Sequence, residues 1–301
     1  MFRTKKEENE MQVKTQKHKQ NKYTVRKKIL FAIVGVFLFL YSLTYIFMLG
    51  WALLSSFRDK LEFIREPLSW PQQWDFANYL DAFDVLEVGG NNLFAMIFNS
   101  LWYSVGGTFI SIFFCNVTGY CICKYKFVGR NAFYNVAILI MLVPVVGAMP
   151  ATYRLLDTLG MVNTPLYLLT MTGGMGFNFL LFYGFYSNVS WEYAEAVFID
   201  GGGHFTVFLR VMLPQSMPMC FALGIVSFIG LWNDYNSTLL YLPDFPTLAT
   251  GLYLFQYVPS IRADYPLYFA AIIMATIPVI VLYACFQEAI MTNSVAGGLK
   301  G

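Results

Sequence analysis

Few side chains in this sequence could carry out catalysis or bind a metal ion, and they are scattered along the chain. A zinc site needs about four nitrogen or sulfur ligands at tetrahedral spacing, and the closest pair, Cys121 and Cys123, supplies two. No Ser/His/Asp, Cys/His or paired-carboxylate pattern occurs, which argues against an enzyme. We therefore expect no metal, no cofactor and no disulfide framework. The full set of histidines and cysteines is His18, His204, Cys115, Cys121, Cys123, Cys220 and Cys285.

The composition is that of a protein that crosses a membrane several times. Hydrophobic residues make up 57% of the chain, charged residues only 13%, and the mean hydropathy is +0.53. Soluble proteins have about a quarter of their residues charged. The apolar run over 29–54 carries no charge and is longer than the core of a signal peptide, so we expect it to remain as a membrane anchor.

Carboxylates within the membrane could couple transport to protons or sodium ions. A charged residue at the centre of a membrane helix costs about 2.5–3.5 kcal/mol, so an ion-coupled carrier keeps several only where they are needed. Here only Asp234 approaches membrane depth. No P-loop pattern for ATP occurs either. If the chain takes part in uphill transport, its energy must come from a separate ATPase; a secondary carrier or channel and a membrane-embedded enzyme are the alternatives.

Six segments are long and apolar enough, or nearly so, to span a bilayer as helices, which predicts an all-α membrane protein. They are 29–54, 93–119, 132–150, 166–186, 215–236 and 266–287. Residues 1–28 carry ten Lys/Arg against three Glu, whereas the remainder carries ten against fifteen acidic residues. The excess of positive charge on cytoplasmic segments places both termini in the cytoplasm, although five basic residues in the predicted outer loops weaken the rule.

Three regions lie outside the predicted spans. We expect the basic tail 1–28 to be a disordered cytoplasmic segment without a nucleic-acid role, since only Phe2 and Tyr23 could stack on bases. The first outer loop, roughly 55–92, is too long to be structureless and should fold onto the outer surface, as an interfacial cap or as a contact for an external partner. Residues 288–301 form a second cytoplasmic tail.

The stretch 190–214 is a long polar interruption between the fourth and fifth predicted spans. Ser190 can cap a helix that ends at Asp200–Gly201, and Gly201–Gly203 provide a turn. One helical stripe precedes the turn and another follows it: Trp191, Ala194, Glu195 and Phe198, mostly apolar, then the apolar Phe205, Phe208, Leu209 and Met212. A helix lying on lipid is usually richer in Lys and Arg than this one, so a protein groove fits the stripes better. The stretch is the predicted site of energy input.

This stretch resembles the EAA loop of permease subunits of binding-protein-dependent ABC importers. The likeness lies in Glu195-Ala196-Val197 and Asp200-Gly201-Gly202, followed by Phe208-Leu209-Arg210-Val211-Met212-Leu213-Pro214. The family more often has Ala at the positions of Val197 and Gly202. Trp232-Asn233-Asp234 and the chain end Gly297-Gly298-Leu299-Lys300-Gly301 are similar to motifs of the carbohydrate-uptake branch, of the maltose-permease second-subunit type. The likeness extends over nearly the whole chain.

The resemblance implies the type I ABC importer permease fold and a multi-pass location in the bacterial plasma (inner) membrane. It implies a second homologous permease subunit, a cytoplasmic ABC ATPase dimer and an extracellular solute-binding protein as partners, beside membrane lipid. The domain 29–287 would contain the loop that couples to the ATPase. The residues expected to couple are Glu195, Ala196, Asp200, Gly201, Phe205, Phe208, Leu209 and Pro214.

The cargo implied by the resemblance is a sugar or oligosaccharide, and a non-sugar polar solute is the alternative. A sugar suits a path lined by aromatic, amide and hydroxyl groups. Four residues of the predicted spans could supply them: Asn116, Asn178, Tyr183 and Asn233. Such residues also pack membrane helices against one another, so their role as ligand contacts is an expectation to be tested by geometry.

Overall fold

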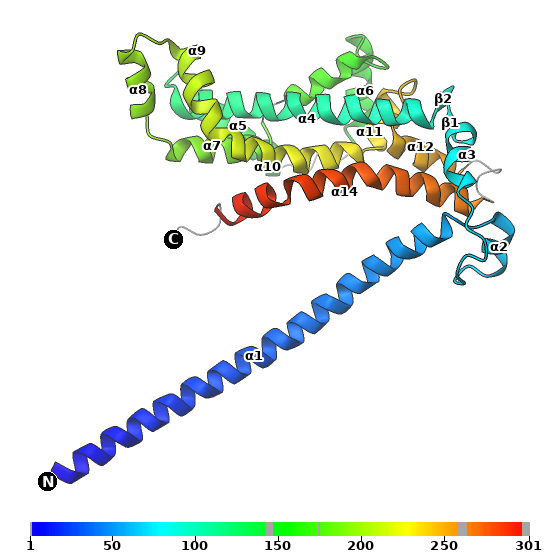
Figure 1. Cartoon of the computed structure of the whole chain (residues 1–301). Coiled ribbons are helices and arrows are strands. Elements are labelled where there is room, and N and C mark those ends of the chain that lie inside the picture. The colour runs from blue at the N-terminus through cyan, green and yellow to red at the C-terminus, as the bar shows by residue number, and fades with distance from the viewer. Residues whose placement is uncertain (1, 143–146, 174, 258–263, 297–301) are drawn as a thin grey trace.

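The computed structural model describes residues 2–142, 147–173, 175–257 and 264–296, with side chains described from residue 27 to residue 287 within those ranges. Within these ranges the chain is helical except for loops and one short hairpin (Figure 1). The elements before the central helix are α1 (Phe2–Ser55), α2 (Lys60–Arg65), α3 (Ala77–Val85), β1 (Glu87–Val88) and β2 (Asn91–Asn92). Those from the central helix to the fourth predicted span are α4 (Leu93–Lys124), α5 (Arg130–Leu142), α6 (Met149–Thr158), η1 (Pro165–Thr172) and α7 (Phe177–Asn188). The remainder are α8 (Glu192–Ile199), α9 (His204–Val207), η2 (Phe208–Met212), α10 (Leu213–Trp232), α11 (Asn236–Tyr241), α12 (Leu248–Phe255) and α14 (Tyr265–Ala296).

Among the described residues, four helical segments are long and apolar enough to cross a membrane: Lys27–Ser55, Leu93–Lys124, His204–Trp232 and Tyr265–Gln287. They correspond to the first, second, fifth and sixth predicted spans. The fourth is a pair of helices, η1 and α7, bent by 48°. The third contains α5, which is too short to cross by itself, and the residues 143–146 that follow it lie outside the described residues. Six spans therefore remain a prediction.

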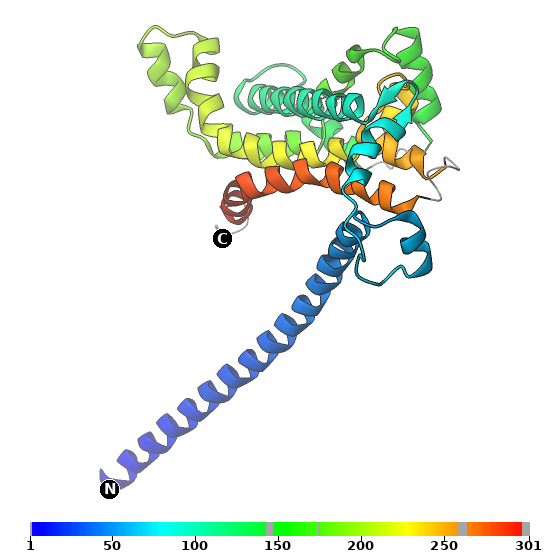
Figure 2. The ribbon, with the colours of Figure 1, turned by 45° about the vertical axis from the view of Figure 1, so that its right-hand side comes forward.

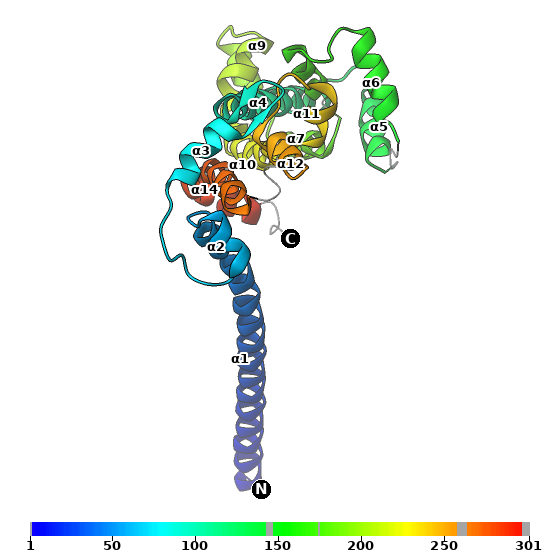
Figure 3. The ribbon, with the colours of Figure 1, turned by 90° about the vertical axis from the view of Figure 1, so that its right-hand side faces the viewer.

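Helix α1 projects away from the other helices in all three views (Figures 1, 2 and 3). Its apolar part is unburied, and it touches the body near its end, where the Trp51 ring lies 5.2 Å from that of Phe269. The prediction of a disordered tail is corrected, because α1 begins at Phe2 and runs through the tail without a break. No glycine or proline precedes Gly35, and Lys, Glu and Gln are good helix formers.

Helix α4 lies at the centre of the body and packs against α7, α10 and η1. Its glycines allow close approach: a Cβ on Gly119 would lie 2.8 Å from Cβ of Phe182 in α7. The long helices run side by side, so that α8 and α9 lie at one end of the body and the β1–β2 hairpin lies at the other (Figure 1). The loop 190–214 and the first outer loop are thus at opposite ends, as the predicted topology requires.

The first outer loop folds compactly, as the sequence predicted. Its centre is Arg58, which is 1% exposed and donates hydrogen bonds to the carbonyls of Glu66 and Pro67 at 3.0 and 2.9 Å and to the Ser69 hydroxyl at 2.9 Å. Backbone carbonyls are strong acceptors and bind one end of this buried guanidinium, while its Nε makes only a 3.9 Å contact with the Glu62 carboxylate. Whether this cap contacts an external partner stays a prediction.

Candidate coupling loop and polar groove

The loop 190–214 forms two helices joined by the predicted glycine turn. Helix α8 ends at Ile199, and Gly201 follows with φ of +80°, a left-handed conformation that glycine adopts at low cost. The amide of Gly201 donates to the carbonyl of Phe198 at 3.0 Å, and that of Gly202 donates to the carbonyl of Val197 at 2.8 Å. At its other end, α8 begins one residue later than predicted, and the Ser190 hydroxyl accepts a bond from the amide of Glu192 at 3.2 Å.

The second helix of the loop is continuous with the fifth span. Helix α9 passes through one turn of π-helix, η2, into α10 without leaving helical geometry. Pro214 lacks the amide that would bond to the carbonyl of Arg210 in an α-helix, which favours a wider turn at this point. The loop is therefore rigidly attached to a membrane-spanning helix at its C-terminal side.

The predicted apolar stripes divide into buried and exposed parts. Ala194, Phe208 and Met212 are buried and belong to a core cluster with residues of α4 and α7. Exposed large side chains are instead Ile199 at 86% and Phe205 at 74%. The interpretation of Phe208 as part of an exposed docking stripe is corrected, because it faces the interior and is 7% exposed. The remaining expected coupling residues, Glu195, Ala196, Asp200, Gly201, Leu209 and Pro214, are all exposed.

Asn116 is part of a closed hydrogen-bond network within the body. Its amide nitrogen donates to Ser216 Oγ at 2.7 Å and to Cys220 Sγ at 3.0 Å, and its oxygen accepts from the Tyr186 hydroxyl at 2.7 Å. We call these four residues the buried amide network. Asn116 and Ser216 are both 0% exposed. The interpretation of Asn116 as a substrate contact is therefore corrected in this conformation: the network joins α4, α7 and α10.

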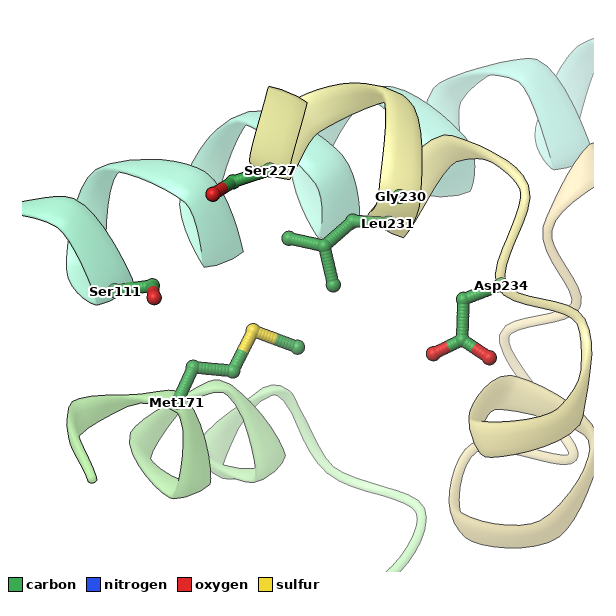
Figure 4. Close-up of a pocket in the computed structure, with 6 residues that line it drawn as sticks. All are labelled: Ser111, Met171, Ser227, Gly230, Leu231 and Asp234. Atoms are coloured by element: carbon green, nitrogen blue, oxygen red, sulfur yellow. The ribbon is translucent and has the colours of Figure 1, made fainter. Parts of the chain in front are cut away.

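A hollow of about 550 Å³ lies between α4, η1 and α10, and an adjoining one of about 270 Å³ lies between α4, η1 and the start of α7. Both are lined by Ser111 and Met171, which makes them compartments of one space that we call the polar groove. Figure 4 shows the larger compartment, with the Met171 side chain reaching from η1 toward Leu231. Its polar lining consists of Ser111, Ser227 and Asp234, and Asn178 lines the smaller compartment.

The other three expected substrate contacts have different places in the structure. Asn178 reaches the polar groove and donates to Ser227 Oγ at 3.3 Å. Tyr183 packs against Tyr134, with ring centroids 4.6 Å apart, in a separate small cluster. Asn233 is exposed, bonds to the carbonyl of Ile229 at 2.8 Å and lines another hollow between α10, α12 and α14. The structure thus separates the four residues and brings only Asn178 into the polar groove.

Sequence reasoning did not identify Ser111, Met171 and Ser227 as lining residues. Small hydroxyl residues are common in membrane helices, and neither serine has a distinctive neighbour in the sequence. Asp234 was recognised as exceptional, and the structure assigns it structural bonds: it accepts from the Tyr103 hydroxyl at 2.9 Å and from the amide of Ser237 at 3.0 Å. Among the residues that the structure describes, no group of three or more His, Cys, Asp or Glu could hold a metal ion.

Residues 107–291 match the family described as binding-protein-dependent transport system inner membrane component. The chain belongs to this family. The matched segment includes most of α4, the whole loop 190–214 and most of α14. The permease is accordingly a multi-pass inner-membrane component of an ABC importer.

Characterised relatives align with most of the permease. It is 30% identical over 271 residues to the diacetylchitobiose uptake system permease protein NgcG of Streptomyces coelicolor, covering 89% of this chain and 88% of the relative. It is 26% identical to the arabinooligosaccharides transport system permease protein AraQ of Bacillus subtilis, covering 88% and 94%. The maltodextrin transport system permease protein MdxG of the same bacterium is 30% identical, covering 67% and 74%.

A solved structure shares the fold. The permease superposes with a TM-score of 0.74 on a chain of a bacterial ABC transporter involved in the import of the acidic polysaccharide alginate. The two are 20% identical, and the match covers 87% of this chain and 96% of the other.

Proposed function

We propose that this permease carries a sugar or an oligosaccharide, delivered by an extracellular binding protein, across the plasma membrane. The observation that carries the proposal is the polar groove, in which amide and hydroxyl groups border a space of sugar-sized volume beside the membrane-spanning helices. The uptake of saccharides by the relatives named above supports the same cargo class.

ATP hydrolysis belongs, in this proposal, to a separate ATPase dimer that docks at the loop 190–214. The docking face in this proposal consists of the exposed apolar residues Ile199, Phe205 and Leu209, together with the acidic residues of α8. Large exposed apolar side chains at the end of the body fit a partner groove, because they would otherwise remain in water. In this topology α8 and both chain termini are cytoplasmic, with six spans in total.

A second permease subunit completes the path. An 18-residue apolar stretch of α1 is entirely unburied, and its length suits packing against another membrane subunit. In this proposal a homologous subunit packs beside the polar groove and closes the path. ATP-driven closure of the ATPase dimer would then move the two subunits between inward- and outward-facing states as rigid bodies.

The cargo is tested with the complete importer in proteoliposomes. We expect ATP-dependent uptake of at least one radiolabelled saccharide among diacetylchitobiose, arabinooligosaccharides and maltodextrins, in the presence of the cognate binding protein. Uptake should persist with an uncoupler, because no ion gradient drives it. Uptake of amino acids or peptides in place of saccharides would favour the non-sugar alternative, and collapse with the uncoupler would favour a secondary carrier.

Docking is tested by Phe205→Asp. The side chain is exposed, so the permease should assemble normally, while the charge should weaken the apolar contact with the ATPase and lower both uptake and binding-protein-stimulated hydrolysis by about tenfold or more. Val128→Asp, at another exposed apolar residue, is the matched control. Equal uptake in wild type and Phe205→Asp would contradict the docking face.

A further inference from the structure

The C-terminal end of α4 contacts the loop 190–214 and the residue before it at three places. Lys124 Nζ donates to the carbonyl of Val189 at 2.5 Å, where the chain enters the loop. The Tyr125 hydroxyl lies 3.1 Å from Nδ1 of His204, directly after the glycine turn. The Tyr120 ring lies 5.1 Å from that of Phe208, at the start of η2. The end of one helix therefore contacts the chain where it enters the loop, after the glycine turn and at the start of η2.

Four aromatic rings form a closed cluster at this junction. Tyr125 contacts Trp191 at 5.9 Å and His204 at 5.3 Å between ring centroids. Phe198 closes the cluster, 6.2 Å from Trp191 and 4.9 Å from His204. We call these four residues the aromatic clasp. It joins three segments: the end of α4, α8 with the residue before it, and the first residue of α9.

The hydrogen bond within the clasp is its directional part. The energy of a ring contact changes little with small shifts, so one element can slide on another. A hydrogen bond, by contrast, weakens steeply when its angle changes. The Tyr125 hydroxyl has two neighbours, His204 and the Tyr120 hydroxyl, each at 3.1 Å. The position of His204 is thereby fixed relative to α4 as well as to α8.

Helix α4 also lines the polar groove. Ser111, which borders both compartments, lies 13 residues before Lys124 on the same helix. At 1.5 Å per residue this separates the groove from the clasp by about 20 Å. No proline interrupts α4. A rotation or tilt imposed at its C-terminal end is therefore transmitted directly to the groove.

We propose that the aromatic clasp, with Tyr125 and His204 as positioning residues, transmits movement of α8 and α9 to α4 and so keeps ATP hydrolysis in step with cargo movement. The proposal rests on the proposed docking of the ATPase at the loop 190–214. It assigns to His204 a role that the docking face does not need, since Ile199, Phe205 and Leu209 would still contact the ATPase if the clasp were opened.

The test measures uptake and ATP hydrolysis together in the complete importer. Tyr125→Phe removes the hydroxyl and keeps the ring, and His204→Phe keeps a ring without Nδ1. Each should lower the number of cargo molecules moved per ATP by about 2- to 10-fold, the range expected for one hydrogen bond, while hydrolysis continues. The double variant should lose no more than either single variant, because both remove the same bond.

Two further variants separate coupling from simple loss of structure. His204→Asn places an amide oxygen near the position of Nδ1 and should restore most of the ratio. Tyr283→Phe removes an exposed hydroxyl from α14 that makes no hydrogen bond within the described part of the chain, and should leave the ratio unchanged. If Tyr125→Phe lowers the amount of assembled complex, the proposal is tested with His204→Phe and His204→Asn instead. The cargo-to-ATP ratio should then be lower in His204→Phe than in His204→Asn.

The possible results distinguish the clasp from the proposed function. A wild-type complex without ATP-driven saccharide uptake would contradict the proposed function. A wild-type complex that transports, with the same cargo-to-ATP ratio in His204→Phe, would overturn the clasp alone. Parallel loss of uptake and hydrolysis at a constant ratio would also overturn it, since that result describes a purely structural role.

Discussion

The permease contains two asparagines that donate to serines of α10, and they differ in what surrounds them. Asn116 donates to Ser216 at 2.7 Å, accepts from Tyr186 and is fully buried. Asn178 donates to Ser227 at a longer 3.3 Å and borders the polar groove. Asn116 uses both of its amide hydrogens and is enclosed by its partners, so a ligand cannot reach it, whereas Asn178 retains bonding capacity beside open space. Residue type in a span therefore does not identify a substrate contact.

The largest expected effect is that of Asn116→Leu. The change leaves the buried hydroxyls of Tyr186 and Ser216 without this partner, at about 1–3 kcal/mol for each buried group. We expect a clear loss of thermal stability of the purified complex in detergent and a low yield from membranes. Normal stability with selectively altered cargo affinity would show that Asn116 contacts substrate. The distinction between a structural Asn116 and a substrate-facing Asn178 would then be wrong.

The opposite outcome is expected for Asn178→Leu, which is the matched variant. One long hydrogen bond is lost, so stability should change by about 1 kcal/mol or less. The apparent KM for saccharide uptake should rise by roughly 5- to 10-fold, because the groove loses an amide that can bond to cargo hydroxyls. An unchanged KM would place the cargo path elsewhere.

The smallest effect on transport is expected from Gly107→Ala, in α4 next to two residues that line the polar groove, Met171 and Leu231. The new Cβ would lie 2.5 Å from Sδ of Met171 and 2.9 Å from Cδ1 of Leu231. Met171 is flexible and can move into the groove, so we expect a loss of about 1–2 kcal/mol.

Uptake of longer saccharides should fall more than uptake of short ones, because the two compartments share Met171. Gly224→Ala is the control, since its Cβ would meet Thr108 Cγ2 at an ordinary 3.7 Å. The prediction assumes that Met171 lies between the two compartments and that a longer saccharide must occupy both. An equal effect on long and short saccharides would contradict that assumption.

Local sequence signals identified the helical class, four of the spans and the glycine turn at Gly201. Each depends on residues that are close in the chain: an uncharged apolar run, or a glycine that alone tolerates a left-handed backbone. The bend between η1 and α7 was not predicted, although Gly173 and Gly176 mark its place.

The candidate site was less accessible to prediction, because its geometry depends on contacts between distant residues. Asn116 and Ser216 are 100 positions apart, and the two helices must be packed before either residue is seen to be satisfied. In the same way, periodicity placed Phe208 on an apolar stripe of the second loop helix. Only the packing of Tyr120 against it shows that this side of the stripe faces inward.

The π-helical turn at 208–212 makes the orientation of α9 depend on chain length as well as on residue type. A π-turn contains one residue more than the surrounding α-helix needs. Deleting a single residue there would let the helix close regularly and would rotate α9 by about 100° relative to α10. Phe205 would then point in a different direction, although the identities of the remaining residues would be unchanged. The direction in which α9 presents its side chains therefore depends on the number of residues in η2. Substitutions keep that number, and a one-residue deletion changes it.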